Sequence, residues 1–144
     1  MEVLTQSAEE TGNLAANIVK KLLQNESESA TVVGLCGELG SGKTTFMKGI
    51  ASALGVKETI VSPTFVIEKI YKLENSKFDH LIHFDAYRIE KSDELLHLGW
   101  NEMISNPKNL IFVEWPERVI DIMPENHKKI EFHHSDENKR TIIF

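Results

Sequence analysis

The hydrophobic positions along the chain predict an alternation of helices and short strands. Helical spacing recurs in two segments, one from Ser7 to about residue 23 and one from about residue 43 to Gly55. Ser7 and Glu10 fit a capping box at the start of the first segment, and Gly55 is typical of a helix end. The apolar residues that carry the spacing are Leu14, Ile18 and Leu22, followed by Phe46, Ile50 and Leu54.

Uninterrupted apolar and β-branched runs predict buried strands at 31–36 and 110–113. We also predict an extended stretch from 62 to 71 and, after a turn at 74–77, a returning strand at 78–84. Ser92 is expected to cap a short helix in which Leu95, Leu96 and Leu98 pack inward. Near the end of the chain, an antiparallel pair is expected at 130–133 and 141–144, around a turn at 136–138.

Composition narrows the class of protein. The 144 residues are 41% hydrophobic and 26% charged, which is typical of one globular domain, and we assign residues 1–144 to it. No apolar run reaches the length of a membrane span and no leader is evident, so we expect a cytoplasmic protein. The formal net charge of −6 argues against general nucleic-acid binding by this chain itself. The single cysteine, Cys36, is predicted to be a small core residue.

Residues 37–44, Gly-Glu-Leu-Gly-Ser-Gly-Lys-Thr, match the phosphate-binding P-loop G-x-x-x-x-G-K-[ST] and lie between a predicted strand and a predicted helix. Glycines allow a backbone whose N–H groups surround phosphate oxygens, and the following helix adds its positive dipole end. Lys43 is expected to reach the β- and γ-phosphates and Thr44 to ligate Mg²⁺. The fold predicted is therefore a three-layer, P-loop NTPase-like α/β fold, whose mixed sheet has a parallel core and antiparallel additions. The loop residues expected to bind phosphate are Glu38, Leu39, Gly40, Ser41, Gly42, Lys43, Thr44 and Thr45.

Two acidic residues follow predicted strands. Glu114 ends the run at 110–113, the position of a Walker B acid, and we favour that role over a surface glutamate. Asp85 ends the strand at 78–84 and is either a second carboxylate near Mg²⁺ or an ordinary strand end. Thr64 could place an oxygen near the γ-phosphate, although its spacing alone favours a strand-initiating turn at Ser-Pro-Thr. Trp115 could stack on a nucleotide or a partner, but packing is its commoner role.

Several other chemistries lack their residues. There is no N-K-x-D or D-x-x-G element, which argues against a guanine-reading GTPase. The chain has only three arginines, Arg88, Arg118 and Arg140, fewer than the acceptor pocket and lid of a kinase usually use. Its histidines show no metal-ligand spacing. The pattern favours a minimal ATPase or nucleotide switch.

Four motifs occur together in one order: residues 37–46, 62–65 (Ser-Pro-Thr-Phe), 83–88 (His-Phe-Asp-Ala-Tyr-Arg) and 114–117 (Glu-Trp-Pro-Glu). In this order and spacing the chain resembles the TsaE family, also called YjeE, from about residue 5 to 118. The family comprises small bacterial P-loop ATPases required for threonylcarbamoyladenosine modification of tRNA. Departures are small, since the family usually has Asp at Glu38, Ala at Ser41 and Leu at Ala86.

The resemblance implies an ATP- and Mg²⁺-dependent ATPase that acts with TsaD and TsaB and contacts tRNA only through that complex. Such a protein supports turnover without transferring the threonylcarbamoyl group, and its hydrolysis is weak until the partners stimulate it. By motif, Lys43 and the loop amides would hold phosphates, and Thr44 and Glu114 would hold Mg²⁺. Asp85 and Thr64 would lie near the γ-phosphate, and Thr11 near the base.

Three questions stay open at this level. Arg88 is either a local arginine finger or a surface residue beside Tyr87. A small-molecule kinase would use the same P-loop, although no lid is evident. A nucleotide switch that does not hydrolyse ATP is the other alternative.

Overall fold

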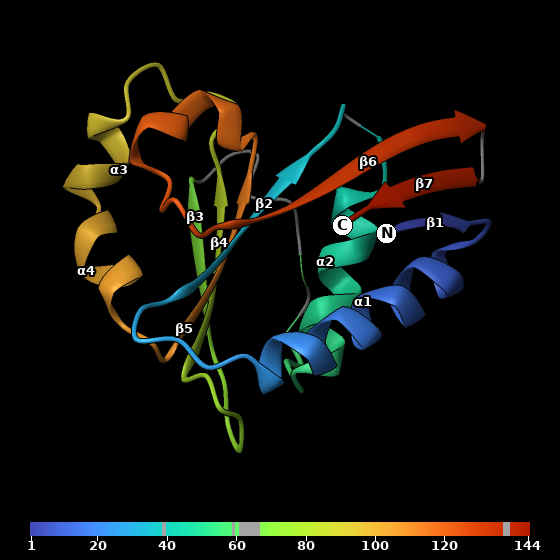
Figure 1. The fold of residues 1–144 in the computed structure, drawn as a ribbon, viewed down its shortest axis with the longest axis horizontal. Coiled ribbons are helices and arrows are strands. Elements are labelled where there is room, and N and C mark those ends of the chain that lie inside the picture. The colour runs from blue at the N-terminus through green and yellow to red at the C-terminus, as the bar shows by residue number, and fades with distance from the viewer. Residues whose placement is uncertain (39, 59, 61–66, 137–138) are drawn as a thin grey trace.

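A mixed sheet runs through the molecule with helices on both faces (Figure 1). This computed structural model describes residues 1–144 except 39, 59, 61–66 and 137–138. In the described part of the chain the sheet has seven strands in the order β1-β7-β6-β2-β5-β4-β3. Their bounds are β1 Glu2–Thr5, β2 Thr31–Cys36, β3 Glu68–Lys72, β4 His80–Asp85, β5 Asn109–Glu114, β6 Lys128–Asp136 and β7 Lys139–Ile143.

The centre of the sheet is parallel and its edges are antiparallel, as predicted. Strand β2 pairs in parallel with both β5 and β6, and β4 continues the parallel set beside β5. Strands β3, β7 and β1 are antiparallel to their neighbours. Parallel pairing brings the carboxyl ends of β2, β4 and β5 to the same end of the sheet, where ligands of α/β sheets bind. At these strand ends, Asp85 on β4 is the register partner of Glu114 on β5.

Two hydrophobic layers enclose the sheet. Helices α1 (Ala8–Gln24) and α2 (Lys43–Ala53) cover one face, where Phe46, Leu110 and Phe112 belong to one buried cluster. Helices α3 (Asp93–His97) and α4 (Trp100–Ser105) and the 3₁₀ helix η1 (Pro116–Ile122) cover the other, with Trp100 and Phe84 at its centre. The three-layer architecture is confirmed.

Helix α1 begins as the sequence predicts, with one difference in its cap. The Ser7 hydroxyl accepts a hydrogen bond from the Glu10 backbone N–H at 3.0 Å. The Glu10 carboxylate accepts from the Gln6 N–H at 2.6 Å, one residue earlier than a capping box requires. Both bonds satisfy amides before or within the first turn, so the helix start is well specified.

Two details of the predicted α3 region are wrong. Ser92 is the N-cap of α3, but its own backbone is already helical, and its hydroxyl donates to Asp121 and accepts no hydrogen bond from a backbone N–H of the helix. Leu98 is 43% exposed, whereas Leu95 is fully buried. Helix α3 ends at His97 and Gly99, at φ 87°, redirects the chain into α4, so Leu98 falls outside the helical stripe.

Other differences concern elements that local pattern does not reveal. Helix α4 and strand β1 were not predicted, and β1 is an edge strand whose partner, β7, lies at the other end of the chain. The predicted stretch at 62–71 is a strand only from Glu68, and residues 62–66 lie outside the described residues. The turn at 74–77 does connect β3 to β4. The predicted terminal pair is confirmed as β6 and β7, although 137–138 in its turn are not described.

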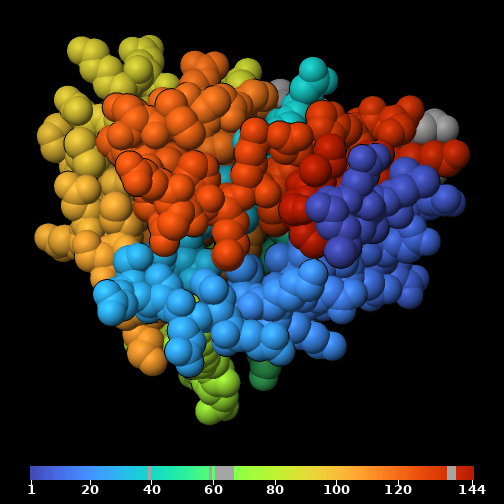
Figure 2. Space-filling view, viewed as in Figure 1, coloured from blue at the N-terminus to red at the C-terminus, as the bar shows by residue number. Residues whose placement is uncertain are grey.

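The two ends of the chain lie together at one edge of the sheet, where β1 pairs with β7. Figure 2 shows the N-terminal segment against the C-terminal residues, and the Met1 amino group donates to the Phe144 carbonyl at 2.6 Å. Strand β1 pairs with β7 from Glu2 opposite Ile143 to Thr5 opposite Arg140. Among the described residues, no helix is long and apolar enough to span a bilayer.

Candidate functional site

The loop after β2 has the backbone that a phosphate cradle requires. Strand β2 ends at Cys36 and α2 begins at Lys43, which confirms the strand–loop–helix context of the motif. Gly37, Gly40 and Gly42 have φ of 152°, 77° and 105°, values that residues with a Cβ rarely adopt. A Cβ at Gly37 would also lie 2.8 Å from the Phe132 carbonyl oxygen. The loop therefore depends on glycine for both conformation and space.

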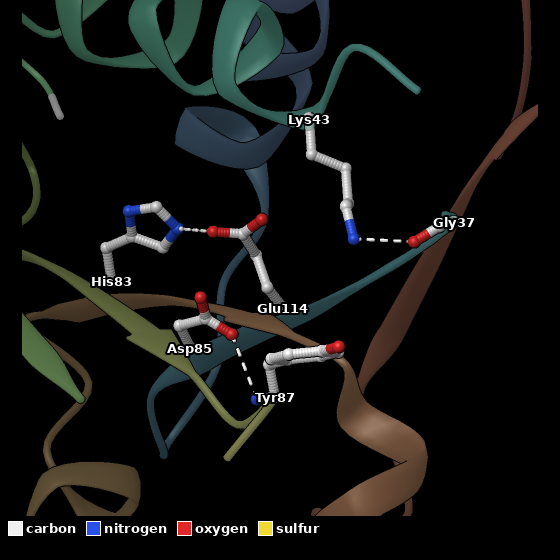
Figure 3. Close-up of polar contacts among 6 residues, drawn as sticks. All are labelled: Gly37, Lys43, His83, Asp85, Tyr87 and Glu114. Carbon is white, nitrogen blue, oxygen red and sulfur yellow. Dashed lines mark hydrogen bonds and ion pairs between the residues drawn. The ribbon is translucent and has the colours of Figure 1, made fainter. Parts of the chain in front are cut away.

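Lys43 is held at the mouth of this loop by two contacts. Its ammonium donates to the Gly37 carbonyl at 2.6 Å (Figure 3) and lies 4.3 Å from the centre of the Trp115 ring. Burial lowers the pKa of Lys43, because a desolvated ammonium is less stable than a hydrated one. The residue is 5% exposed. A buried cation at this position is well placed to exchange these neutral partners for an anionic ligand.

Glu114 lies at the end of β5 and is bound by a histidine that the sequence analysis did not assign. His83 Nε2 and Glu114 Oε2 are 2.7 Å apart, and both side chains are almost fully buried (Figure 3). A carboxylate can only accept, so Nε2 carries the proton and donates. The signal was present in the spacing: His83 is two residues before Asp85 and shares its face of β4, and Asp85 is the partner of Glu114 in the next strand.

Asp85 ends β4 beside Glu114. Its Oδ1 accepts a hydrogen bond from the Tyr87 backbone N–H at 2.9 Å. Burial raises the pKa of Asp85, and the nearby Glu114 carboxylate raises it further, whereas the Tyr87 amide, His83 and Lys43 oppose the shift. Two carboxylates this close are costly unless a cation lies between or beside them.

These residues line one cavity of about 340 Å³. From the predicted site it contains Lys43, Asp85, Glu114 and part of the phosphate loop, and Tyr87, Trp115 and Arg140 complete its wall. Trp115 has φ 58°, and its ring lies 5.2 Å from that of Tyr87 and 4.3 Å from the Lys43 ammonium. It is partly buried and both lines the cavity and packs against the second hydrophobic cluster. The predicted loop and helix residues in the wall are Gly40, Gly42, Lys43, Thr44 and Thr45.

Other predicted residues lie elsewhere or are untested. Thr11 is in a neighbouring cavity, buried, with its hydroxyl 2.8 Å from that of Thr5. Leu39 and Thr64 lie outside the described residues. Arg88 is not among the described residues that line the main cavity. Cys36 is only partly buried, contrary to the prediction, and burial raises the pKa of its thiol.

The donors fit a phosphate group and a hard cation. The Ser41 hydroxyl is buried beside Gly37 and has no hydrogen-bond partner among the described residues, so the loop holds one unsatisfied polar group. Thr44, Asp85 and Glu114 line the same cavity, and their side chains carry oxygen, the donor type that Mg²⁺ prefers. The described residues contain no group of three or more His, Cys, Asp or Glu side chains placed so that they alone could hold a metal ion. A magnesium ion would therefore depend on Thr44, water and phosphate oxygens as well as on the two acids.

Comparison with known proteins gives a consistent result. The family model described as "Threonylcarbamoyl adenosine biosynthesis protein TsaE" matches residues 5–142. The "tRNA threonylcarbamoyladenosine biosynthesis protein TsaE" of Aquifex aeolicus is 36% identical over 142 residues, covering 92% of this chain and 95% of that protein. The protein of the same name from Bacillus subtilis is 35% identical over 140 residues, covering 97% and 82%.

A solved structure shares the fold. The crystal structure of YdiB from Bacillus subtilis aligns with a TM-score of 0.74 at 27% sequence identity, and the alignment covers 99% of this chain and 82% of that one. The likeness extends over both helical layers and the whole sheet, including the C-terminal strands in which sequence analysis found no motif.

Proposed function

This chain belongs to the TsaE family, and we propose that it is the ATP-binding and ATP-hydrolysing subunit of the machinery that makes threonylcarbamoyladenosine in tRNA. The observation that carries the proposal is the convergence of Lys43, Thr44, Asp85 and Glu114 on one cavity beside the phosphate loop. The names of the relatives support the pathway, and the family resemblance supports TsaD and TsaB as partners and the cytoplasm as the location.

The residues have separable tasks in this proposal. The loop amides and Lys43 bind the phosphates of ATP, with Lys43 leaving the Gly37 carbonyl for the β- and γ-oxygens. Thr44, Glu114 and Asp85 hold Mg²⁺, which when bound neutralises charge on those oxygens. His83 is hydrogen-bonded to Oε2 of Glu114 and would hold this carboxylate in place for the metal or its water.

Slow hydrolysis by the isolated chain is part of the proposal. Arg88 is not among the described residues in the wall of the cavity. Arg140 is in that wall, but it packs on Gly42 at the start of α2, so we expect an arginine at the γ-phosphate to come from a rearrangement or from a partner. A cation supplied to the γ-phosphate in trans contributes about 10³–10⁵ in rate. Stimulation by TsaB and TsaD is therefore the expected mode of activation.

The test is phosphate release from Mg-ATP by the purified chain, alone and with TsaB–TsaD, with Lys43→Ala as the control. We expect slow release that the pair raises strongly and that Lys43→Ala abolishes. Tight ATP binding without stimulated hydrolysis would favour a nucleotide switch instead. A phosphorylated small molecule and acceptor-dependent ADP formation would favour a kinase.

A further inference from the structure

Arg140 lies where two cavities meet at the start of α2. The main cavity and a smaller one of about 120 Å³ share Gly42, Thr45 and Arg140 in their walls. The rest of the smaller cavity is formed by Ser7, Ala8 and Thr11, at the beginning of α1. A ligand that extends from the phosphate loop into the smaller cavity must therefore pass Arg140.

The Arg140 side chain packs directly on the phosphate loop. A Cβ placed on Gly42 would lie 3.0 Å from Nε of Arg140 and 3.2 Å from its Cδ. Gly42 is also the N-cap of α2, with φ 105°. The guanidinium nitrogen Nε is thus held against the backbone that begins the helix, and glycine at 42 is what allows this approach.

The strand that carries Arg140 is tied to the start of α1. Arg140 on β7 is the register partner of Thr5 on β1, so the two side chains share a face of the sheet. The hydroxyl of Thr5 is hydrogen-bonded to that of Thr11, and both residues are 2% exposed. These contacts connect the wall of the smaller cavity to the sheet and limit where Arg140 can lie.

Charge at this place is arranged for an anion. The N-terminus of α2 carries a partial positive charge, and its first turn, which is described in full, contains no acidic residue. The wall of the main cavity also contains Lys43 and Arg140, together with the carboxylates Asp85 and Glu114, whereas the described wall of the smaller cavity contains Arg140 and no acidic residue. A cation beside a helix N-terminus is unfavourable by itself and becomes favourable when an anion binds between them.

The position of Arg140 selects one phosphate. In P-loop proteins the lysine reaches the β- and γ-phosphates, while loop amides surround the α- and β-phosphates. Lys43 therefore accounts for the β- and γ-phosphates. Arg140 and Thr45 also line the smaller cavity, and Lys43 is not among its described lining residues, so Arg140 lies on the side of the main cavity away from the γ-phosphate. We propose that Arg140 binds the α-phosphate of the nucleotide. The nucleoside then lies on the side of Ser7 and Thr11, where the family resemblance already implies the base. This inference rests on the proposed function.

The test is the dissociation constant of ADP, measured by isothermal titration calorimetry at fixed salt concentration, without partners and without turnover. Arg140→Met is compared with Lys139→Met, which removes the same charge from the neighbouring, exposed position of β7. We expect Arg140→Met to weaken ADP binding by about 10- to 100-fold, the usual effect of losing a hydrogen bond to a charged group. Lys139→Met should change it by less than about twofold, because a surface charge outside the site is screened.

Arg140→Lys is expected to give an intermediate affinity, because a point charge remains but the planar fork is lost. Thermal unfolding of each variant reports whether it is folded, and Arg140→Gln replaces Arg140→Met if the latter is not. Equal ADP affinity of the Arg140 and Lys139 variants would overturn the inference and leave the proposed function intact. Failure of the unsubstituted chain to bind ADP would overturn the proposed function, and the inference with it.

Discussion

Removal of His83 should destabilise the protein through Glu114. The two side chains are 1% and 6% exposed, and the hydrogen bond between them is 2.7 Å long. His83 Nδ1 is buried without a hydrogen-bond partner among the described residues, so the imidazole ring is held by its single hydrogen bond to Glu114 within the described part of the chain. His83→Ala therefore leaves a carboxylate without its donor inside the protein.

The magnitude follows from the charge of the acceptor. A hydrogen bond to a charged group contributes about 1.5–3 kcal/mol, whereas one between neutral groups contributes about 0.5–1.5 kcal/mol. We expect His83→Ala to lower the free energy of unfolding by at least about 1.5–3 kcal/mol, with any cavity left by the ring adding to the loss. In a Glu114→Gln background the hydrogen-bond part of the loss should fall to the neutral range. The coupling between the two substitutions is thus about 1 kcal/mol or more.

Urea unfolding of the four proteins of this double-mutant cycle measures that coupling. The cavity left by the ring is common to both His83→Ala variants and cancels in the cycle. The reasoning is refuted if the two single substitutions add to the double one within about 0.3 kcal/mol. A coupled pair would identify His83 as the residue that holds the Glu114 carboxylate in place.

Three further predictions concern stability. Lys43→Met should raise the free energy of unfolding of the nucleotide-free protein by about 0.5–2 kcal/mol, because burial lowers the pKa of Lys43 and the charged ammonium is therefore less stable in the folded protein than in water. Chemical denaturation near neutral pH measures this change, and a less stable variant would contradict the prediction. Folding raises the pKa of Asp85 above the ordinary value of 3.8, so at a pH above 3.8 the folded protein keeps a proton on this carboxyl that the unfolded chain has lost. The free energy of unfolding should therefore fall as pH rises from about 3.8 through the raised pKa, and Asp85→Asn should remove this part of the pH dependence. Gly49→Ala should cost about 1–3 kcal/mol, because its Cβ would lie 2.8 Å from that of Ala15 across the α1–α2 contact. Gly12→Ala on the facing helix, whose Cβ meets nothing within 4 Å, should instead stabilise by about 0.5–1 kcal/mol, and equal melting temperatures of these two variants would show that the contact is not tight.

Local sequence determined the parts of this protein that depend on neighbouring residues. The phosphate loop was predictable because its glycines, Lys43 and Thr44 are contiguous and act through their own backbone and the helix they begin. Helices α1 and α2 followed from apolar spacing, because each buries one stripe against the sheet. Glu114 and Asp85 were found because each ends a recognisable strand.

Tertiary structure alone decided which of these residues meet, and which others join them. Parallel register places Asp85 opposite Glu114, and the packing of β4 against β5 brings His83 within hydrogen-bonding distance of that carboxylate. Arg140 reaches the loop only because β7 pairs with both β6 and β1, strands from opposite ends of the chain. The left-handed backbone of Trp115, which turns its ring toward Lys43, is likewise invisible in local pattern. Contacts across about a hundred residues depend on strand order and register, which the folded sheet sets by burying its two faces together.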